Sequence, residues 1–188
     1  MDNRNLLIRS ACHLFANRGY DAVGVQELVE NVGVTKPTLY HYFGSKEGLF
    51  CSILETYLEP FTNQLIKTSI YKGDIVSSLE RIARIYFDFA REESQFFRLW
   101  MTVRFNPPQS ITYQAIAPYL NNHHKIISDF FVQAAQQHGN MLGRQKTYSI
   151  SFLGMTFTFA TLALQDELPI NEQLVSSAVH QFMYGIFS

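Results

Sequence analysis

Apolar residues recur every three or four positions along almost the whole chain, which is the periodicity of amphipathic helices. In the first stripe they stand at positions 7, 8, 11, 14 and 15, and similar stripes return in each later segment. No run alternates apolar and polar residues between turn signals, as a half-buried strand would. The pattern predicts an all-α fold of about nine or ten helices.

Capping and breaking residues divide the start of the chain. Asp2 is suited to cap a first helix over about residues 4–18, which Gly19 ends because glycine accepts left-handed backbone. A short second helix is predicted over about residues 25–32. Gly33 then permits a tight turn.

A third short helix follows that turn. Thr35 is its expected cap, and Pro37 fits the first turn because amides there have no helical partner to lose. Gly44 ends this helix, and Ser45 caps a long fourth helix reaching roughly Lys67.

Breaks at a Gly-Asp pair, at prolines and at serines predict five more helices in the rest of the chain. We expect Pro118 to kink or restart one of them, and Pro169 to separate the last two. These helices are expected over about residues 75–91, 94–104, 110–139, 145–164 and 171–187.

The charge of the chain does not alter the predicted fold. The chain carries a formal net charge of −1, and residues 1–50 hold five basic and five acidic side chains. This balance argues against a nonspecific coat for nucleic acid, so any DNA affinity depends on where individual charges lie.

Cysteine usage and the longest uncharged segment bear on location. Cys12 and Cys51 each fall in a helical pattern and are expected to be reduced thiols of a cytoplasmic protein. No charged-then-apolar leader opens the sequence, so export is not expected. Nineteen residues between Lys146 and Asp166 are uncharged, but Ser, Thr and Gln interrupt them, which favours a buried helix over a membrane span.

Two short helices joined by a glycine turn, after a longer helix, are the parts of a helix-turn-helix. The third helix offers hydrogen-bond donors and short side chains on one face. Leucine, valine and phenylalanine side chains in all three helices supply a small core. We therefore predict a DNA-binding domain over residues 1–50, with its motif at residues 24–43, and a second domain over residues 51–188.

The stretch LFANRGYDAVGVQELVENVGVTKPTLYHYFGSKEGLF, residues 14–50, resembles the tetracycline-repressor (TetR) family along its whole length. The resemblance implies an all-helical homodimer with an N-terminal DNA-binding head and a C-terminal body for ligand binding and dimerisation. Many such proteins repress transcription until a small molecule binds. Gly24 departs from the family pattern, which often has a capping Ser or Thr there.

The same resemblance implies the DNA contacts. Lys36 and Thr38 would face base edges, and Tyr40 a phosphate or thymine methyl. Lys46 has separate support, because a cation in a helix's first turn opposes the helix dipole unless an anion approaches. The complete set of expected DNA-binding residues is Thr35, Lys36, Pro37, Thr38, Tyr40, His41, Tyr42 and Lys46.

Aromatic residues are numerous in the body. Base rates favour a core position for most of them, and the family resemblance supports the hypothesis that some line a pocket for an apolar or aromatic effector. The residues expected to bind that ligand are Phe87, Phe96, Trp100, Phe105, Tyr113 and Phe130.

A stripe of small residues beside large apolar ones marks a helix in the last third of the chain. Small side chains let backbones approach, and the apolar mass is unfavourable in water, so two copies are expected to pair there. The expected interface residues are Ser151, Phe152, Gly154, Met155, Thr158, Phe159 and Leu162. The operator would then be a near-palindrome.

Other chemistry has little support. His123 and His124 are adjacent, so on a helix they diverge by about 100° and chelate a metal poorly. No phosphate-binding glycine loop or nucleophile motif occurs, so we expect no enzyme, metal or cofactor. Two alternatives to a ligand-released repressor remain: a DNA-binding dimer whose body only dimerises or docks a protein, and a ligand-binding module with a vestigial head.

Overall fold

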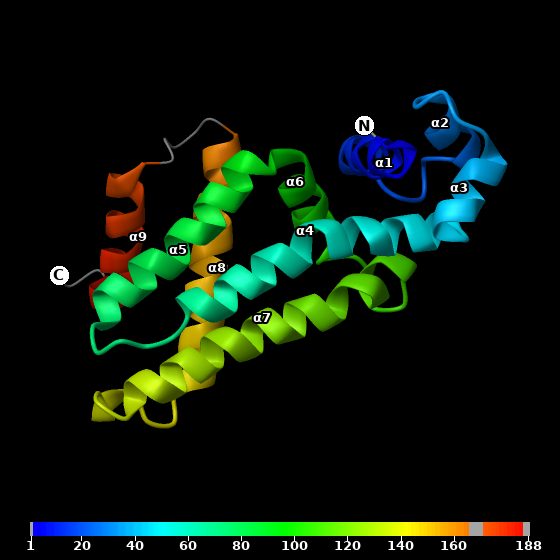
Figure 1. Cartoon of the computed structure of the whole chain (residues 1–188). Coiled ribbons are helices and arrows are strands. Elements are labelled where there is room, and N and C mark those ends of the chain that lie inside the picture. Colours follow the sequence, from blue (N-terminus) through cyan, green and yellow to red (C-terminus); the bar gives the residue numbers. More distant parts are fainter. Residues whose placement is uncertain (1, 166–170, 186–188) are drawn as a thin grey trace. The chain divides into compact units, whose positions relative to one another are not determined.

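The computed structural model describes residues 2–165 and 171–185. Within these ranges the chain forms nine α-helices and one 3-10 turn, without a strand (Figure 1). The all-α prediction is confirmed. The expected break at Pro169 and the expected helix end near Phe187 lie outside the described residues.

The helix bounds agree closely with the sequence pattern. Most ends lie within two residues of their predicted positions, and the largest difference is α7, which ends at Ala135 rather than near Gly139. The helices are α1 (Asn3–Arg18), α2 (Val25–Glu30), α3 (Lys36–Phe43), α4 (Lys46–Thr68), α5 (Ile75–Glu92), α6 (Ser94–Val103), α7 (Ile111–Ala135), α8 (Gln145–Leu164) and α9 (Glu172–Tyr184).

Local signals account for these bounds. The Asp2 carboxylate accepts the Arg4 amide at the start of α1, and Ser45 Oγ accepts the Gly48 amide at 2.9 Å at the start of α4. Gly19 and Gly44 end their helices with φ of 83° and 72°, which side-chain-bearing residues rarely adopt.

Of the two outcomes expected at Pro118, a restarted helix is wrong. α7 continues through Pro118 without restarting, as α4 does through Pro60. Each proline removes one backbone donor, and the hydrogen bonds on either side hold the helix together.

The described contacts divide the chain into two compact units. Unit 1 holds residues 1–60 and 95–120, and unit 2 holds residues 61–94 and 121–188. α4 and α7 contribute to both units. The contact-defined unit 1 is larger than a head of residues 1–50, because α6 and the start of α7 belong to it.

Unit 1 is held together by buried rings. Phe15 lies 5.1 Å from Tyr20 and 6.2 Å from Phe50, measured between ring centroids. Tyr57 of α4 stacks on Phe96 of α6 at 4.5 Å. Stacked and edge-to-face rings at these spacings add to the burial energy, so α6 is tied to the same core as α4.

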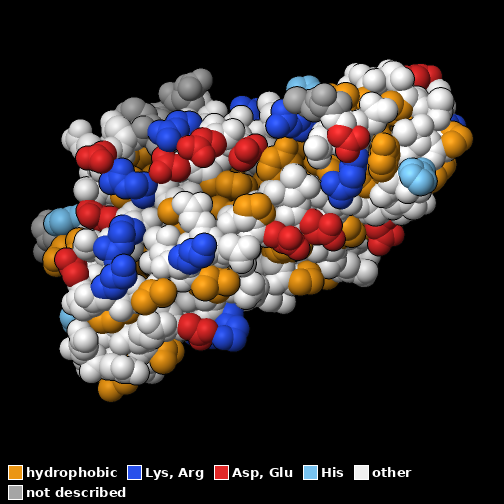
Figure 2. Space-filling model, in the orientation of Figure 1, with side chains coloured by type: hydrophobic (Ala, Val, Ile, Leu, Met, Phe, Trp, Pro, Cys, Tyr) orange, Lys and Arg blue, Asp and Glu red, His pale blue; other side chains and the backbone are white. Residues whose placement is uncertain are grey.

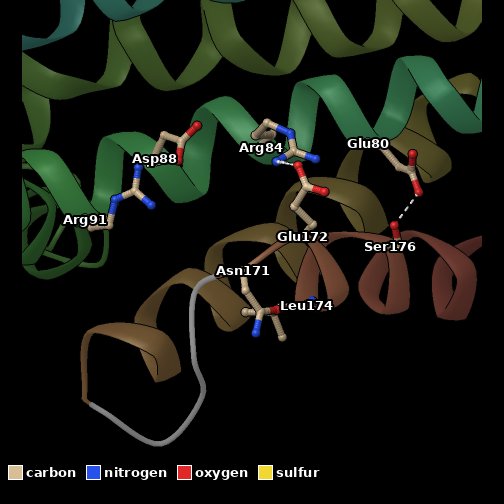
Figure 3. A network of polar contacts seen from close by, with 8 residues as sticks. All are labelled: Glu80, Arg84, Asp88, Arg91, Asn171, Glu172, Leu174 and Ser176. Atoms are coloured by element: carbon tan, nitrogen blue, oxygen red, sulfur yellow. Dashed lines mark hydrogen bonds and ion pairs between the residues drawn. The ribbon is translucent and has the colours of Figure 1, made fainter.

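In unit 2, α5 packs against both α8 and α9, which also contact each other (Figure 1). Polar contacts join α5 to α9 at the surface, as Figure 3 shows. Arg84 pairs with Glu172 at 3.2 Å, and the Ser176 hydroxyl donates to Glu80 at 2.8 Å. These exposed pairs fix the register of α9, while buried apolar side chains supply most of the energy.

α8 is the one helix among the described residues that is long and apolar enough to cross a membrane by length and composition. About two fifths of its most apolar stretch, 39%, is buried inside the protein. Its Ser149, Phe152 and Thr156 side chains are buried within unit 2. The rest of that stretch is exposed or half-buried.

Candidate nucleic-acid interface

α1, α2 and α3 pack on one another and form the small trihelical core that the sequence predicts. Phe15, Leu28 and Leu39, one from each helix, are fully buried. Leu14 of α1 and Val32, which follows α2, are only half-buried. Because each helix buries one face, the outer face of α3 remains available to a partner.

The turn between α2 and α3 depends on glycine. Gly33 has a φ of 74°, and its amide donates to the Glu30 carbonyl at 3.1 Å. The Val34 amide then donates to the Val29 carbonyl at 3.0 Å. These bonds satisfy backbone groups at the end of α2 and set the direction in which α3 leaves.

α3 exposes the expected set of polar side chains. Thr35, Lys36, Pro37 and His41 are exposed and Thr38 is half-buried, whereas Leu39 and Phe43, four residues apart, face the core. Exposed donors on a helix of eight residues are what base-edge contacts in a major groove require.

Thr35 departs from its expected role. It occupies the cap position, but its hydroxyl does not bind a backbone amide of α3. It lies instead 2.9 Å from the Thr38 hydroxyl. The two threonines therefore orient each other.

Tyr40 and Tyr42 are both exposed. Tyr40 exposes 47% of its surface and Tyr42 exposes 37%. The Tyr42 ring lies 5.5 Å from His41 and 6.0 Å from Phe43, which accounts for its greater coverage. Neither tyrosine is buried, and Tyr40 is the less covered of the two.

Lys46 is not a freely solvated lysine. Its ammonium donates to the Tyr20 carbonyl at 2.6 Å and lies 4.1 Å from the centroid of the Tyr20 ring. Burial lowers the pKa of Lys46, and the nearby Asp21 carboxylate partly offsets that effect. One donor of the ammonium is occupied by the protein, and two remain for an anion.

A side-chain hydrogen bond and an ion pair attach α2 and its end to α1, and neither can be predicted from the sequence pattern. Asn31 donates to the Ser10 hydroxyl at 2.6 Å, and Arg18 pairs with Glu27. The partners are 21 and 9 residues apart. Pairs of exposed polar residues at such separations occur by chance in any sequence, so only the structure distinguishes them.

Charge does not form one basic face in the view that Figure 2 draws. Blue basic and red acidic side chains are interspersed there. This agrees with the net charge of −1. Affinity for a polyanion then depends on individual donors and on backbone amides rather than on a broad field.

The expected ligand residues fall in different units. Phe87 and Phe130 belong to unit 2, whereas Phe96, Trp100 and Tyr113 belong to unit 1. Of these five, Tyr113 is half-buried and the rest are fully buried. Phe105 is also in unit 1, and it exposes 80% of its surface. The Arg104 guanidinium lies 5.1 Å from the centroid of its ring. Phe105 is therefore not buried, unlike most of the residues expected to bind the ligand.

Unit 2 contains a buried polar pair that sequence reasoning missed. Thr62 Oγ1 and His123 Nε2 lie 2.8 Å apart among the rings of Phe61 and Tyr86. His124, its neighbour, is half-buried on another side of α7. The divergence of the two histidines is therefore confirmed.

The expected dimer residues divide by face. Ser151, Gly154 and Thr158 are exposed along α8, and Met155, Phe159 and Leu162 are half-buried. Phe152 is a correction, because it is fully buried within unit 2. Its ring packs against Phe131 of α7 and Phe182 of α9, at 6.4 and 5.4 Å between centroids.

Residues 7–53, which cover α1–α3 and the start of α4, match the family model described as "Bacterial regulatory proteins, tetR family". The chain carries the DNA-binding head of TetR-family transcriptional regulators. It is therefore a DNA-binding regulator and not an enzyme.

Three similar proteins match this chain beyond the head. The HTH-type transcriptional activator FasR of Mycolicibacterium smegmatis is 23% identical over 185 residues, covering 98% of this chain and 82% of that protein. The TetR-family regulator PfmR of Thermus thermophilus superposes with a TM-score of 0.77 at 20% identity, covering 99% of this chain and 98% of that one. FadR of Bacillus subtilis, solved in complex with stearoyl-CoA, gives a TM-score of 0.79 at 17% identity, covering 96% and 97%. At these identities the two structures establish the fold alone.

Proposed function

We propose that this chain is a homodimeric repressor that reads a near-palindromic operator with α3 and leaves it when an apolar effector binds. The observation that carries the DNA-reading part is the outer face of α3. It presents Lys36, Thr38 and Tyr40 on a helix whose direction is set by the Gly33 turn. Lysine contacts guanine, and threonine contacts several bases or the thymine methyl, which suits direct readout.

Selection from random duplex DNA tests this reading. We expect a near-palindrome with half-sites about 34–36 Å apart, one helical turn of DNA between centres. The Lys36→Ala variant serves as the comparison in the same selection. An enriched set without inverted symmetry, or no enrichment at all, would refute a dimeric operator reader.

The dimer proposal rests on the exposed face of α8. Ser151, Gly154 and Thr158 are small and follow one another at helical spacing, so a second α8 can approach closely. A two-fold pairing of α8 and α9 would produce a four-helix interface.

Gly154 offers a clean perturbation of that interface. A Cβ at Gly154 meets no atom within 4 Å, so Gly154→Gln is compatible with the folded protomer. We expect this variant to sediment as a monomer and to bind a full operator more weakly. Asn122→Gln, an exposed change on α7, is the control. A Gly154→Gln protein that stays fully dimeric contradicts pairing through this stripe.

The effector proposal rests on unit 2. Its interior joins aromatic rings of Phe61, Tyr86 and Phe157 to the buried Thr62–His123 pair, an arrangement suited to an apolar chain with one polar group. FadR of Bacillus subtilis was crystallised with stearoyl-CoA. We therefore propose a long-chain acyl compound, such as a fatty acyl-CoA, as the effector.

Operator binding measured by fluorescence anisotropy tests the effector. We expect stearoyl-CoA to release the chain from its operator, and free CoA to have no effect. Tighter operator binding in the presence of stearoyl-CoA would indicate an activator, as the relative FasR is named. Binding that ignores acyl compounds of every length would favour a body that only dimerises or docks a protein.

A further inference from the structure

A groove lies between α7 and the start of α8, within unit 2. Its volume is about 440 Å³, within the usual range for small-molecule sites. The groove is lined by Asn121, His124, Lys125, Ser128, Lys146, Ser149 and Ile150. These residues are outside the DNA-binding head and outside the aromatic interior of unit 2.

The lining is rich in hydrogen-bond donors and positive charge. Two lysines, Lys125 and Lys146, contribute ammonium groups, while Asn121 and Ser128 contribute an amide and a hydroxyl. Among the described residues that line the groove, none is acidic. Ile150 is its one fully apolar side chain.

The two lysines differ in their partners. Lys125 pairs with Asp129, one turn along α7, at 2.5 Å. Lys146 has no carboxylate within ion-pair distance in the part of the chain that the structure describes. The groove therefore keeps an excess of positive charge, which an anion placed between the two ammonium groups would neutralise.

The floor of the groove is fixed in place. Ser149 is buried, and its hydroxyl donates to the His124 carbonyl at 3.1 Å, joining α8 to α7. This bond lies close in sequence to Lys146 on α8 and to Lys125 on α7. A rigid floor lowers the entropy lost when a ligand is bound.

The spacing of donors indicates the size of the ligand. Asn121 and Ser128 are seven residues apart on α7, which places their Cα atoms about 10 Å from each other along the helix. A diphosphate or a phosphorylated organic molecule is closer to that length than inorganic phosphate is. Lysine is a common partner of phosphate oxygens.

We propose that this groove binds a phosphate-bearing small molecule, with Lys125 and Lys146 neutralising its charge and Asn121 and Ser128 donating to its oxygens. The residues of the groove are separate from those proposed to contact the operator and from the aromatic interior proposed for the acyl chain of the effector. The ligand of the groove belongs to the class of diphosphates and larger phosphorylated metabolites.

Calorimetric titration of the full-length chain with pyrophosphate tests the proposal. Citrate at equal ionic strength distinguishes phosphate from other polyanions, and inorganic phosphate tests the length argument. We expect saturable pyrophosphate binding, with weaker binding of the other two anions. Equal heats from pyrophosphate and citrate would overturn the assignment to phosphate.

Variants locate the binding. Lys125 and Lys146 are exposed, so the double change Lys125→Ala with Lys146→Ala is compatible with folding, which circular dichroism verifies. We expect this variant to bind pyrophosphate at least about a hundredfold more weakly, since each charged hydrogen bond contributes about tenfold or more. Lys67→Ala, an exposed lysine at the end of α4, is the matched control and should bind normally.

Two outcomes refute the groove as the site. One is equal pyrophosphate binding by the double variant and the wild type. The other is a double variant whose operator binding loses salt dependence, which would assign both lysines to DNA phosphates instead.

Discussion

Replacing Lys46 by methionine separates its structural contacts from its proposed contact with DNA. Methionine keeps an unbranched apolar stem over the Tyr20 and Phe15 rings but removes the ammonium. In the free protein the ammonium gains a hydrogen bond and a ring contact but loses hydration. Because burial lowers the pKa of Lys46, the lost hydration outweighs the gains. The substitution should therefore change the free energy of unfolding by less than about 1 kcal/mol.

The effect on DNA should be larger and should depend on salt. Each phosphate neutralised by a lysine contributes about 0.9 to the slope of log K against log salt concentration. With Lys46 in both subunits of a dimer, Lys46→Met should flatten that slope by about 1.8. Anisotropy titrations on the selected operator at several KCl concentrations measure it, with Lys67→Met as the control. An unchanged slope would show that Lys46 does not contact a DNA phosphate and that its role is limited to its contacts with Tyr20.

The pH dependence of stability gives a second check on the same residue. Between the lowered pKa of Lys46 in the folded state and its ordinary value in the unfolded state, the unfolded chain binds more protons. Stability in this window therefore gains a positive contribution as pH rises. The difference in unfolding free energy between wild type and Lys46→Met should change in that direction across the alkaline range. A constant difference would contradict the lowered pKa.

Three further substitutions test the head and the body. Lys36→Ala should reduce the preference for one base in each half-site by about 1–3 kcal/mol, as measured by competition between operator variants. If binding to all sequences weakens equally, Lys36 contacts a phosphate instead. Gly44→Ala should destabilise the protein by about 1–2 kcal/mol in urea unfolding, because φ is 72° and an added Cβ meets no atom within 4 Å, so backbone strain acts alone. Asn171→Ala should lower the free energy of unfolding by about 1 kcal/mol, because Asn171 Oδ1 accepts the Leu174 amide at 2.8 Å. Asn171→Asp should retain most of that stability. Equal losses in the two variants would exclude the cap as the cause.

Local interactions explain why the sequence alone was enough for the helix bounds. Asp2 binds an amide two residues away, Ser45 an amide three residues away, and Gly44 needs only its own backbone freedom. Such signals act within about one helical turn, so they can be recognised without knowing what the helix packs against. The head was identifiable for the same reason, since its motif is contiguous.

Thr35 marks the limit of that reasoning even at short range. Its position predicts a cap, and it does occupy the cap position. Its hydroxyl nevertheless binds the Thr38 hydroxyl. Two acceptable partners lay within one turn, and the choice between them depended on side-chain geometry that no residue pattern contains.

Only the tertiary structure decided which face of α8 is core. Phe152 lies next to Ser151 in the sequence, and both were expected on one surface. Phe152 packs between α7 and α9, while Ser151 is exposed. Apolar and small polar residues are mixed around α8, so its sequence lacks the contrast between faces that marks the buried one. The packing of the neighbouring helices decides which face is buried.

Lys46 and the α7–α8 groove illustrate the same division. A lysine at the start of a helix is visible in the sequence, but the Tyr20 carbonyl that holds it lies 26 residues away. The lining residues of the groove come from α7 and α8, which are joined by a loop and a 3-10 turn. The sequence by itself determined the helices, their ends and the DNA-binding motif, because these depend on neighbours along the chain. Burial, side-chain partners and the groove depend on residues distant in sequence, so packing alone decided them.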